Sequence, residues 1–407
     1  MSRVLVHTGP YPVDEQLGGI GLRLWETAQL LADAGHPVTL ALPRPSPFGH
    51  PGITVTARPW QDLLDGADAV LTTDLPDTRL LLAARTRGLL QVVENAPPIE
   101  HLHYERLAAA DGQALYEDTV ARWRLQLLLA DHLLVRSEAE RASTLGALVA
   151  AGRLSAAHHR AGPSLEHLIS LLPIGFNAYS RAAADAAGPG EAAVDVVWSG
   201  GAWDYCHPAL LLPALAHALA LGRPLTLRML YEPGEAFRHQ VRALGLDDLV
   251  RLPAGPLHHT DRDRLLNSAR CLAITGARTA ENATCHRLRL RDAALYRLPV
   301  VVDPHGATGE VVAALGIGAL ADPADPKALA DALITATGDG PVRTGYLHRL
   351  DTARTDRFRL ENHLGPLLNL LNQGRPAPDR EHGAHHAAIQ HLLDNHPQLT
   401  HTAPDVI

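Results

Sequence analysis

Short apolar runs recur along the first half of the chain, and stretches with helical spacing lie between them. The runs that we predict to be strands lie at residues 4–8, 38–42, 53–57, 68–73, 89–93 and 132–137. A helix is expected at about residues 19–34, before the pair Gly35-His36. Strands that alternate with helices are typical of a parallel, doubly wound sheet. The first half is therefore predicted to be an α/β domain.

The same pattern starts again in the second half of the chain. Its predicted strands lie at residues 194–201, 225–230, 249–254, 270–276 and 299–303. A segment rich in glycine and alanine separates the two series, as a linker would. The fold class is therefore α/β, with two similar doubly wound domains that we expect to face each other across a cleft. The predicted boundaries are 1–178 for the first domain, 179–193 for the linker, 194–355 for the second domain, 356–374 for a C-terminal helix and 375–407 for a flexible tail rich in histidine and proline.

The tail carries polar side chains that can share part of one helix face, namely those of His382, His386, Gln390 and His391. Such a face suggests a metal site. We favour a solvated helix with a flexible end, or an oligomer contact, because chain ends are usually poorly ordered unless they dock. The sequence therefore predicts no metal, and a homodimer stays open.

Composition and charge restrict the class of protein. A chain of 407 residues is long for one core and suggests two domains with appendages. Its formal net charge of −8 argues against nucleic acid or an anionic membrane as the main partner. Three cysteines without metal-ligand spacing suggest a reducing compartment. No apolar run approaches the roughly 18 residues of a spanning helix, and a strand begins at once, so we expect a cytoplasmic protein without signal peptide or stable membrane insertion.

Each half opens with a glycine pair where a strand gives way to a helix. The first pair lies in the run Gly18-Gly19-Ile20-Gly21, and the second is Gly200-Gly201. Glycine at such a turn is usually structural, but it also lets the backbone approach a ligand. Because ligands of open α/β sheets bind at the carboxyl edge of the strands, two such loops favour a binding site.

Residues 281–303 combine several features of an anion site. The segment begins polar, continues with arginines at alternate positions (Arg287, Arg289 and Arg291), and ends in a buried strand after a Leu-Pro turn. The pattern predicts a helix N-terminus that leads into a helix. Such an N-terminus offers N–H groups to an anion, and guanidiniums bind phosphate or carboxylate in pairs of hydrogen bonds. A diphosphate is the expected ligand.

Three segments together resemble the retaining GT-B glycosyltransferases, and are similar to glycosyltransferase family 4. They read GGIGLRLWETAQLLADAGHPVTLALP, VVWSGGAWDYCHPALLLPAL and DRLLNSARCLAITG…ENATCHRLRLRDAALYRLPVVV. The second and third resemble an actinobacterial branch of the family. The resemblance covers about residues 3–370 and implies two Rossmann-like domains with a C-terminal helix that crosses back to the first.

The chain departs from the family's pattern at two positions and at one turn. The family often carries two glutamates where this chain has Thr284 and Asp292, and Arg297 replaces the glycine of a Gly-Leu-Pro turn. The resemblance implies that Asp292 accepts hydrogen bonds from a ribose diol, whereas Thr284 lacks the charge of a glutamate. Many members also place an Arg–Lys pair against the diphosphate. The single lysine, Lys327, lies far away in the sequence, so an arginine must substitute or the clamp is absent.

The donor site that the resemblance implies lies mainly in the second domain. Glu281, Arg287, Arg289 and Asp292 match the spacing Glu-x5-Arg-x-Arg-x2-Asp of the actinobacterial branch, and N–H groups near Cys285 and His286 would hold the distal phosphate. Surface ion pairs are the alternative for the arginines and for Asp292, and a helix N-cap is the alternative for Asp204. The expected donor-binding residues are Gly19, Arg23, Gly200, Gly201, Asp204, Glu281, Thr284, Cys285, His286, Arg287, Arg289 and Asp292.

A second polar patch, residues 94–101, follows the fifth predicted strand. Glu94 and His101 are its candidate catalytic residues, because a carboxylate or imidazole there could polarise an acceptor. An ordinary polar loop turned by two prolines is the alternative. His7 and Asp74 follow two other predicted strands at the same edge and are weaker candidates.

The sequence therefore predicts a glycosyltransferase that uses a nucleoside-diphosphate sugar. The resemblance implies retention of configuration and no obligatory metal or other cofactor. A small hydroxyl- or thiol-bearing acceptor in antibiotic biosynthesis is preferred, because the Ala/Arg-rich composition is typical of actinomycetes. Surface polysaccharide assembly, a non-catalytic protein that binds nucleotide sugars, and an epimerase or phosphorylase stay open.

Overall fold

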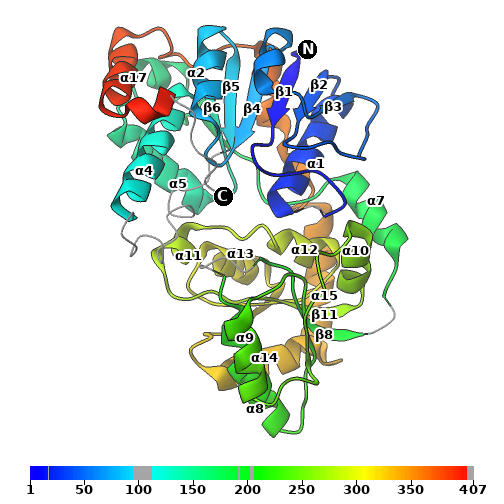
Figure 1. Cartoon of the computed structure of the whole chain (residues 1–407). Coiled ribbons are helices and arrows are strands. Elements are labelled where there is room, and N and C mark those ends of the chain that lie inside the picture. The colour runs from blue at the N-terminus through cyan, green and yellow to red at the C-terminus, as the bar shows by residue number, and fades with distance from the viewer. Residues whose placement is uncertain (17, 95–111, 191–192, 202–205, 401–407) are drawn as a thin grey trace. The chain divides into compact units, whose positions relative to one another are not determined.

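The computed structural model describes residues 1–16, 18–94, 112–190, 193–201 and 206–400 (Figure 1). The chain forms two compact units. The first contains Met1–Pro173 and the chain from Leu360 onward, and the second contains Ile174–Arg359. Each unit has its own buried apolar core.

The first unit is built on a seven-stranded sheet with the order β3-β2-β1-β4-β5-β6-β7. Every neighbouring pair is parallel. The strands are β1 (Val4–His7), β2 (Val38–Ala41), β3 (Ile53–Thr56), β4 (Ala69–Thr73), β5 (Leu90–Glu94), β6 (His132–Val135) and β7 (Ile169–Leu171). The first six confirm the predicted strands, and β7 was missed because three residues give too short an apolar run.

The helices of the first unit cover its sheet and include the end of the chain. They are α1 (Gly19–Asp33), α2 (Thr78–Thr86), α4 (Gly112–Leu129), α5 (Glu138–Ala150), α6 (Ala156–Ala161), α16 (Gly365–Gln373) and α17 (Gly383–Asn395), with 3-10 turns at Trp60–Asp62, Leu64–Gly66, Leu360–His363 and Pro397–Thr400. Leu364, Leu367 and Leu371 bury their side chains with Leu22 and Trp25 of α1 in one core. The predicted return of the chain to the first domain is thus observed.

The second unit is built on a six-stranded parallel sheet with the order β10-β9-β8-β11-β12-β13. Its strands are β8 (Val194–Trp198), β9 (Leu227–Met229), β10 (Val250–Arg251), β11 (Ala269–Ile274), β12 (Val300–Val302) and β13 (Gly318–Leu320). Its helices are α7 (Ala178–Ala187), α8 (Leu212–Ala220), α9 (Glu235–Ala243), α10 (His259–Asn267), α11 (Ala280–Thr284), α12 (Leu290–Leu295), α13 (Ala307–Leu315), α14 (Pro326–Thr337) and α15 (Pro341–Thr355), with a 3-10 turn at Pro208–Leu211.

The helix expected from residue 281 onward is divided in two. Thr279 caps α11 by accepting a hydrogen bond from the Asn282 N–H, and α11 ends after five residues where Cys285 turns extended. The chain then crosses a short loop before α12 begins at Leu290. The expectation of one continuous helix is therefore wrong, and residues 285–289 form a loop.

The expected linker is mostly helical in the structure, and the helix expected in the tail is docked where a solvated one was expected. Helix α7, capped by Asn177, occupies Ala178–Ala187 and so most of the expected linker. Helix α17 lies in the expected flexible tail, and it buries Ile389 and Leu392 in the core of the first unit. The expectation of a flexible tail is wrong for residues 375–400, because these apolar side chains dock. Among the described helices there is none long and apolar enough to cross a membrane.

Candidate functional site

The carboxyl end of β8 holds a stacked arginine. The Arg289 guanidinium carbon lies 4.2 Å from the ring centroid of the buried Trp198, the last residue of β8. A β-carbon added to Gly200 would lie 1.8 Å from the Arg289 Nη1 atom. The space beside Gly200 is therefore filled by Arg289, and the structure brings together two residues that the sequence placed 89 positions apart. Glycine is required at this position because a β-carbon would collide with the Arg289 side chain, as well as with any ligand that approaches the backbone.

The neighbouring arginine, Arg287, is held in a buried ion pair. Its Nη1 and Nη2 atoms lie 2.5 and 2.8 Å from the two carboxylate oxygens of Glu281, and both side chains are buried. Burial lowers the pKa of the Arg287 guanidinium, but the hydrogen bonds and the charge of Glu281 outweigh burial and raise the pKa above its ordinary value. Glu281 and Arg287 therefore neutralise each other, which is the ion-pair alternative considered for Arg287.

Asn282 and Asp303 extend this pair into a buried network. The Asn282 Nδ2 atom donates to an Asp303 carboxylate oxygen at 2.7 Å, and Asn282 Oδ1 accepts from Arg287 Nη2 at 3.2 Å. The Arg287 N–H donates to the Thr308 hydroxyl at 3.0 Å. This network fixes the loop of residues 285–289, on which Arg289 lies. Asn282, Asp303 and Thr308 were not among the predicted site residues, although Asp303 is the last residue of a predicted strand, at the ligand-binding edge.

Asp292 is buried between two arginines. The Arg262 Nη2 atom lies 2.6 Å from one carboxylate oxygen, and the Arg291 Nη1 atom lies 3.4 Å from the other. Burial raises the pKa of Asp292, but the charges of Arg262 and Arg291 outweigh burial and hold the pKa below its ordinary range. Asp292 is therefore an ionised carboxylate whose orientation is set by Arg262, a residue that sequence analysis did not single out.

The remaining candidates of this segment lie at the break between the two helices. The Thr284 hydroxyl donates within α11 to the Ala280 and Glu281 carbonyls, both at 3.3 Å. The Cys285 N–H donates to the Glu281 carbonyl at 2.9 Å, so it is the last bond of α11 and is not directed at a phosphate. Cys285 and His286 are both buried. The Cys285 N–H is thus used within α11, and the expectation that N–H groups near Cys285 and His286 hold the distal phosphate stays a prediction.

In the first unit, Arg23 and Glu94 form one buried ion pair. The Arg23 Nε atom lies 2.6 Å from a Glu94 carboxylate oxygen, and its Nη1 and Nη2 atoms donate to the Pro173 and Leu172 carbonyls at 2.9 and 2.5 Å. Arg23 thus ties α1 to β5 and to the segment after β7. This geometry leaves Arg23 directed at protein acceptors, which differs from the expected contact with phosphate.

Gly19 and Gly201 lie at the turns that the glycine pairs predicted. Gly19 is the exposed first residue of α1, and the N-cap Gly18 makes no side-chain cap. The N–H groups of this first turn are the kind of donors that bind an anion. Gly201 follows Gly200 at the carboxyl end of β8. Both remain predictions as donor contacts.

A further polar cluster lies at the carboxyl edge of the first sheet. Burial lowers the pKa of His7, at the end of β1, to about 4, against the opposing charge of Asp77. Asp74, which follows β4, has a φ of 53° and accepts a short hydrogen bond from the Tyr11 hydroxyl. A left-handed non-glycine residue is uncommon and occurs often at functional sites. His7 and Asp74, which were the weaker candidates from the sequence, therefore remain candidate site residues.

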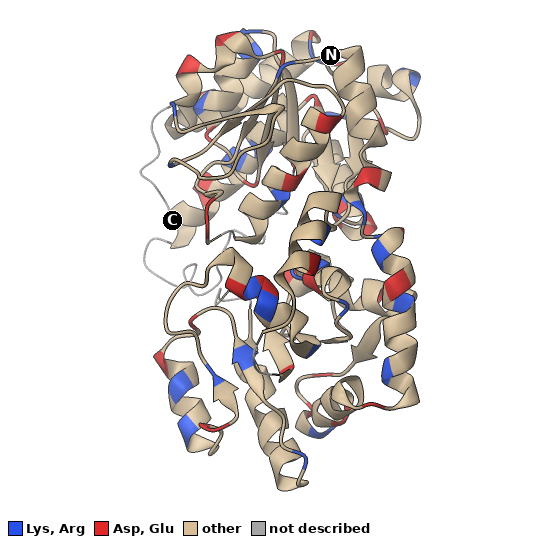
Figure 2. Ribbon diagram, turned by 90° about the vertical axis from the view of Figure 1, so that its right-hand side faces the viewer, with Lys and Arg blue, Asp and Glu red and all other residues tan. Residues whose placement is uncertain are grey.

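Two predicted site residues, His101 and Asp204, lie outside the described residues, as does the rest of the patch after Glu94. Among the described residues, no group of three or more histidine, cysteine, aspartate or glutamate side chains could hold a metal ion. Basic and acidic residues are interspersed along both units, so charge of one sign is not confined to one element (Figure 2).

No family model and no curated protein matches the chain. Solved structures do match its fold. Sucrose-phosphate synthase from Thermosynechococcus elongatus is 17% identical, covers 92% of this chain and 100% of its own, and has a TM-score of 0.60. WaaG, a glycosyltransferase involved in lipopolysaccharide biosynthesis, is 16% identical over 93% and 100%, with a TM-score of 0.61. HepE of Anabaena, solved with UDP-glucose, is 15% identical over 92% and 100%, with a TM-score of 0.62. The chain therefore has the GT-B fold, as the sequence predicted.

Proposed function

We propose that the chain is a glycosyltransferase that moves a sugar from a nucleoside-diphosphate sugar to an acceptor. The observation that carries this proposal is the guanidinium of Arg289, held over Trp198 and against Gly200 at the carboxyl end of β8. Ligands of open α/β sheets bind at this edge, and a guanidinium is well suited to the oxygens of a diphosphate. The GT-B fold supports the same assignment.

Some residues of the second unit would contact the donor, and others would hold the contacting residues in place. Arg289 would contact the diphosphate and stabilise the negative charge that develops as the sugar leaves. The Glu281–Arg287 pair would support the loop that carries Arg289, since its charges already satisfy each other. Asp292, fixed by Arg262, would accept hydrogen bonds from the ribose diol. Thr284, Cys285 and His286 would then shape the loop.

The finer parts of the proposal rest on the family resemblance. We propose retention of configuration without an obligatory metal, where the departing phosphate accepts the acceptor's proton, so that a strong protein base is unnecessary. The acceptor would be a small hydroxyl- or thiol-bearing molecule of antibiotic biosynthesis, handled in the cytoplasm. A surface polysaccharide acceptor and a non-catalytic nucleotide-sugar-binding role are the alternatives to be tested.

Titration calorimetry with UDP-, GDP- and dTDP-glucose tests the donor class. We expect one of them to bind, and we expect Arg289→Met to weaken binding at least tenfold, because the substitution removes the charge and keeps most of the volume. Arg251→Ala, which changes an exposed arginine on β10, is the matched control and should bind as the parent does. Binding of no nucleotide sugar would contradict the proposed function, and unchanged binding in Arg289→Met would contradict the site.

Slow hydrolysis of the bound donor, followed over hours, separates an enzyme from a binding protein. A transferase should release free sugar with the α or β configuration of the donor, which proton NMR of the first product reports. Tight binding with no hydrolysis and no transfer to any offered hydroxyl or thiol would favour the non-catalytic alternative. Product of inverted configuration would contradict retention alone.

A further inference from the structure

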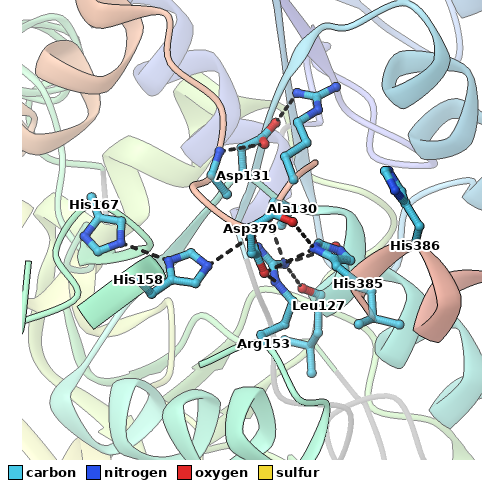
Figure 3. A network of polar contacts seen from close by, with 12 residues as sticks. Leu127, Ala130, Asp131, Arg153, His158, His167, Asp379, His385 and His386 are labelled. Atoms are coloured by element: carbon cyan, nitrogen blue, oxygen red, sulfur yellow. Dashed lines mark hydrogen bonds and ion pairs between the residues drawn. The ribbon is translucent and has the colours of Figure 1, made fainter. Parts of the chain in front are cut away.

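The last described part of the chain, residues 375–400, docks on the first unit through a buried polar network. We call it the C-terminal strap. Asp379 lies among Arg153, His158 and His385, and dashed contacts join it to all three (Figure 3). The Arg153 Nε atom lies 2.6 Å and the His158 Nε2 atom 3.0 Å from the Asp379 carboxylate. The His385 Nδ1 atom lies 3.1 Å from the same carboxylate.

Arg380, the next residue of the strap, forms an ion pair in which the strap supplies the cation and Asp131 supplies the anion. Its Nη1 atom donates to Asp131 and to the Leu89 carbonyl, both at 2.9 Å. The Ala377 N–H donates to the other Asp131 oxygen at 3.0 Å. The strap thus supplies an anion and a cation at adjacent positions, and the first unit supplies the matching cation and anion. A shift of the strap by one residue would bring like charges together, so this pattern fixes its register.

The two charges that the first unit supplies are deeply buried. Arg153 and Asp131 are each 1% exposed. Burial raises the pKa of Asp131, against the charge of Arg380. Burial also raises the pKa of Asp379, but hydrogen bonds from His158, His385 and Arg153 outweigh burial and lower the pKa below its ordinary value. Asp379 and Arg380 are the counter-charges of these two side chains, and removing one partner of a buried ion pair is strongly unfavourable.

The strap also completes the end of helix α4. The Arg153 Nη1 atom donates to the carbonyls of Leu127, Leu128 and Ala130, and the His385 Nε2 atom lies 2.6 Å from the Leu128 carbonyl. Carbonyls of a last helical turn have no partner within the helix, so α4 is capped by His385 of the strap and by Arg153, which Asp379 of the strap holds in place. Ile389 and Leu392 of α17 bury against α4 in the same core, and the two helices lie side by side (Figure 1).

The capped end of α4 is joined to the carboxyl edge of the first sheet. Gln126, the residue before the capped carbonyls, donates from Nε2 to the Asp74 carbonyl at 2.6 Å. Asp74 is the residue with a φ of 53°, and its own N–H donates to the Glu94 carbonyl at 3.2 Å. A continuous series of contacts therefore runs from Asp379 through α4 and Gln126 to the Asp74 turn.

We propose that the C-terminal strap is a conformational clip that holds α4, and through Gln126 the strained Asp74 turn, in one position. When the strap is docked, the turn after β4 keeps its left-handed conformation. When the strap is released, α4 loses the His385 part of its cap, Arg153 loses the carboxylate that holds it at the end of α4, and the turn relaxes, while the second unit is unaffected. This effect on the Asp74 turn does not depend on the proposed function.

Hydrogen–deuterium exchange of the full chain tests the clip. Asp379→Asn keeps the shape of the side chain and removes its charge. We expect amides of residues 112–129 and 70–80 to exchange at least tenfold faster in this variant, with no change in residues 194–302. Asp394→Asn is the matched control, because Asp394 lies in the same strap, on α17, where it is exposed and accepts a hydrogen bond from Gln390. The control should exchange like the parent.

Gln126→Leu removes the hydrogen bond between Gln126 and the Asp74 carbonyl. It provides a second test of the proposal if Asp379→Asn does not fold. We expect this variant to expose residues 70–80 while residues 376–400 stay protected. Fast exchange in the strap of Asp379→Asn with unchanged exchange in residues 70–80 would overturn the proposal, and so would unchanged exchange in residues 70–80 of Gln126→Leu. So would unchanged exchange everywhere in Asp379→Asn. Because no donor or acceptor is present, neither result depends on whether the chain transfers sugar.

Discussion

At the residue scale, Gly200 shows that a glycine at a strand end can serve a neighbouring side chain. The sequence placed Gly200 beside a ligand, whereas the structure fills the position of its absent β-carbon with the Arg289 guanidinium. The guanidinium lies over the Trp198 ring. A cation–π contact of this kind is worth roughly 0.5–2 kcal/mol, with the upper value when the contact is desolvated. The position of the proposed diphosphate contact therefore depends on a residue with no functional group.

We predict that Gly200→Ala weakens binding of the donor about tenfold or more. The new methyl group would lie 1.8 Å from the Arg289 Nη1 atom, so the guanidinium must leave its place over Trp198. Calorimetry with the nucleotide sugar that binds the parent measures the effect. Gly255→Ala is the control, because no atom lies within 4 Å of its added β-carbon. Equal affinity in Gly200→Ala and the parent would show that the stacked position is not needed for binding.

A second prediction concerns Arg297, which has a φ of 60° where the resembling family has glycine. A non-glycine residue in this conformation costs about 1 kcal/mol. Its side chain lies 2.6 Å from Asp351 in an exposed ion pair, and such pairs are worth about 0–1 kcal/mol. We expect Arg297→Gly to be as stable as the parent or slightly more stable, and Arg297→Ala to be about 1 kcal/mol less stable than Arg297→Gly. Urea unfolding measures both, and equal stability of the two variants would contradict the strain.

At the element scale, strands were predictable and short helices were not. Runs such as VVV at Val300–Val302 are β-branched and buried whatever surrounds them, so their strands could be identified from sequence. The break between α11 and α12 could not, because it depends on partners distant in sequence. A β-carbon on Gly306 would lie 2.3 Å from the Asn282 carbonyl, and Asn282 bonds to Asp303. Only the folded chain brings these residues together.

The Asn282–Asp303 contact predicts the effect of an isosteric change. Asn282→Asp would place two buried carboxylates at 2.7 Å and remove the donor between them. We expect a loss of about 3 kcal/mol at pH 7, with part of it recovered at pH 5, because two close carboxylates share a proton more readily. Urea unfolding of the second unit measures the loss.

The reciprocal double variant Asn282→Asp/Asp303→Asn is the control for this prediction. It restores one amide and one carboxylate, with the amide at position 303 now donating to the carboxylate at position 282. The Arg287 guanidinium can still donate to the side chain at position 282. We expect it to recover most of the lost stability. A double variant no more stable than Asn282→Asp would show that the direction of this hydrogen bond, or another contact of Asp303, decides the stability.

At the scale of the whole molecule, one buried histidine of the first unit makes its core sensitive to acid. His132, at the start of β6 in the first unit, is buried and lies 3.0 Å from the His167 carbonyl and 2.7 Å from the Ser170 hydroxyl. Burial lowers the pKa of His132 to about 4, against the hydrogen bond with His167. An unfolded histidine has a pKa near 6.5, so between about pH 6.5 and 4 the unfolded chain binds more protons than the folded one.

The first unit should therefore lose stability as the pH falls through this window, and should keep it fully above about pH 6.5. For His132 alone the loss at pH 5 is about 2 kcal/mol, from 1.5 pH units at 1.36 kcal/mol each. Urea unfolding at pH 7 and pH 5, followed by hydrogen exchange in peptides of each unit, measures it. His132→Gln, which cannot take up a proton, should reduce the acid-dependent loss in the first unit by that amount and leave the second unit's pH dependence as it is in the parent. If the variant and the parent lose the same stability between pH 7 and pH 5, His132 is not the group that takes up the proton, and the acid sensitivity of the first unit must come from another buried side chain.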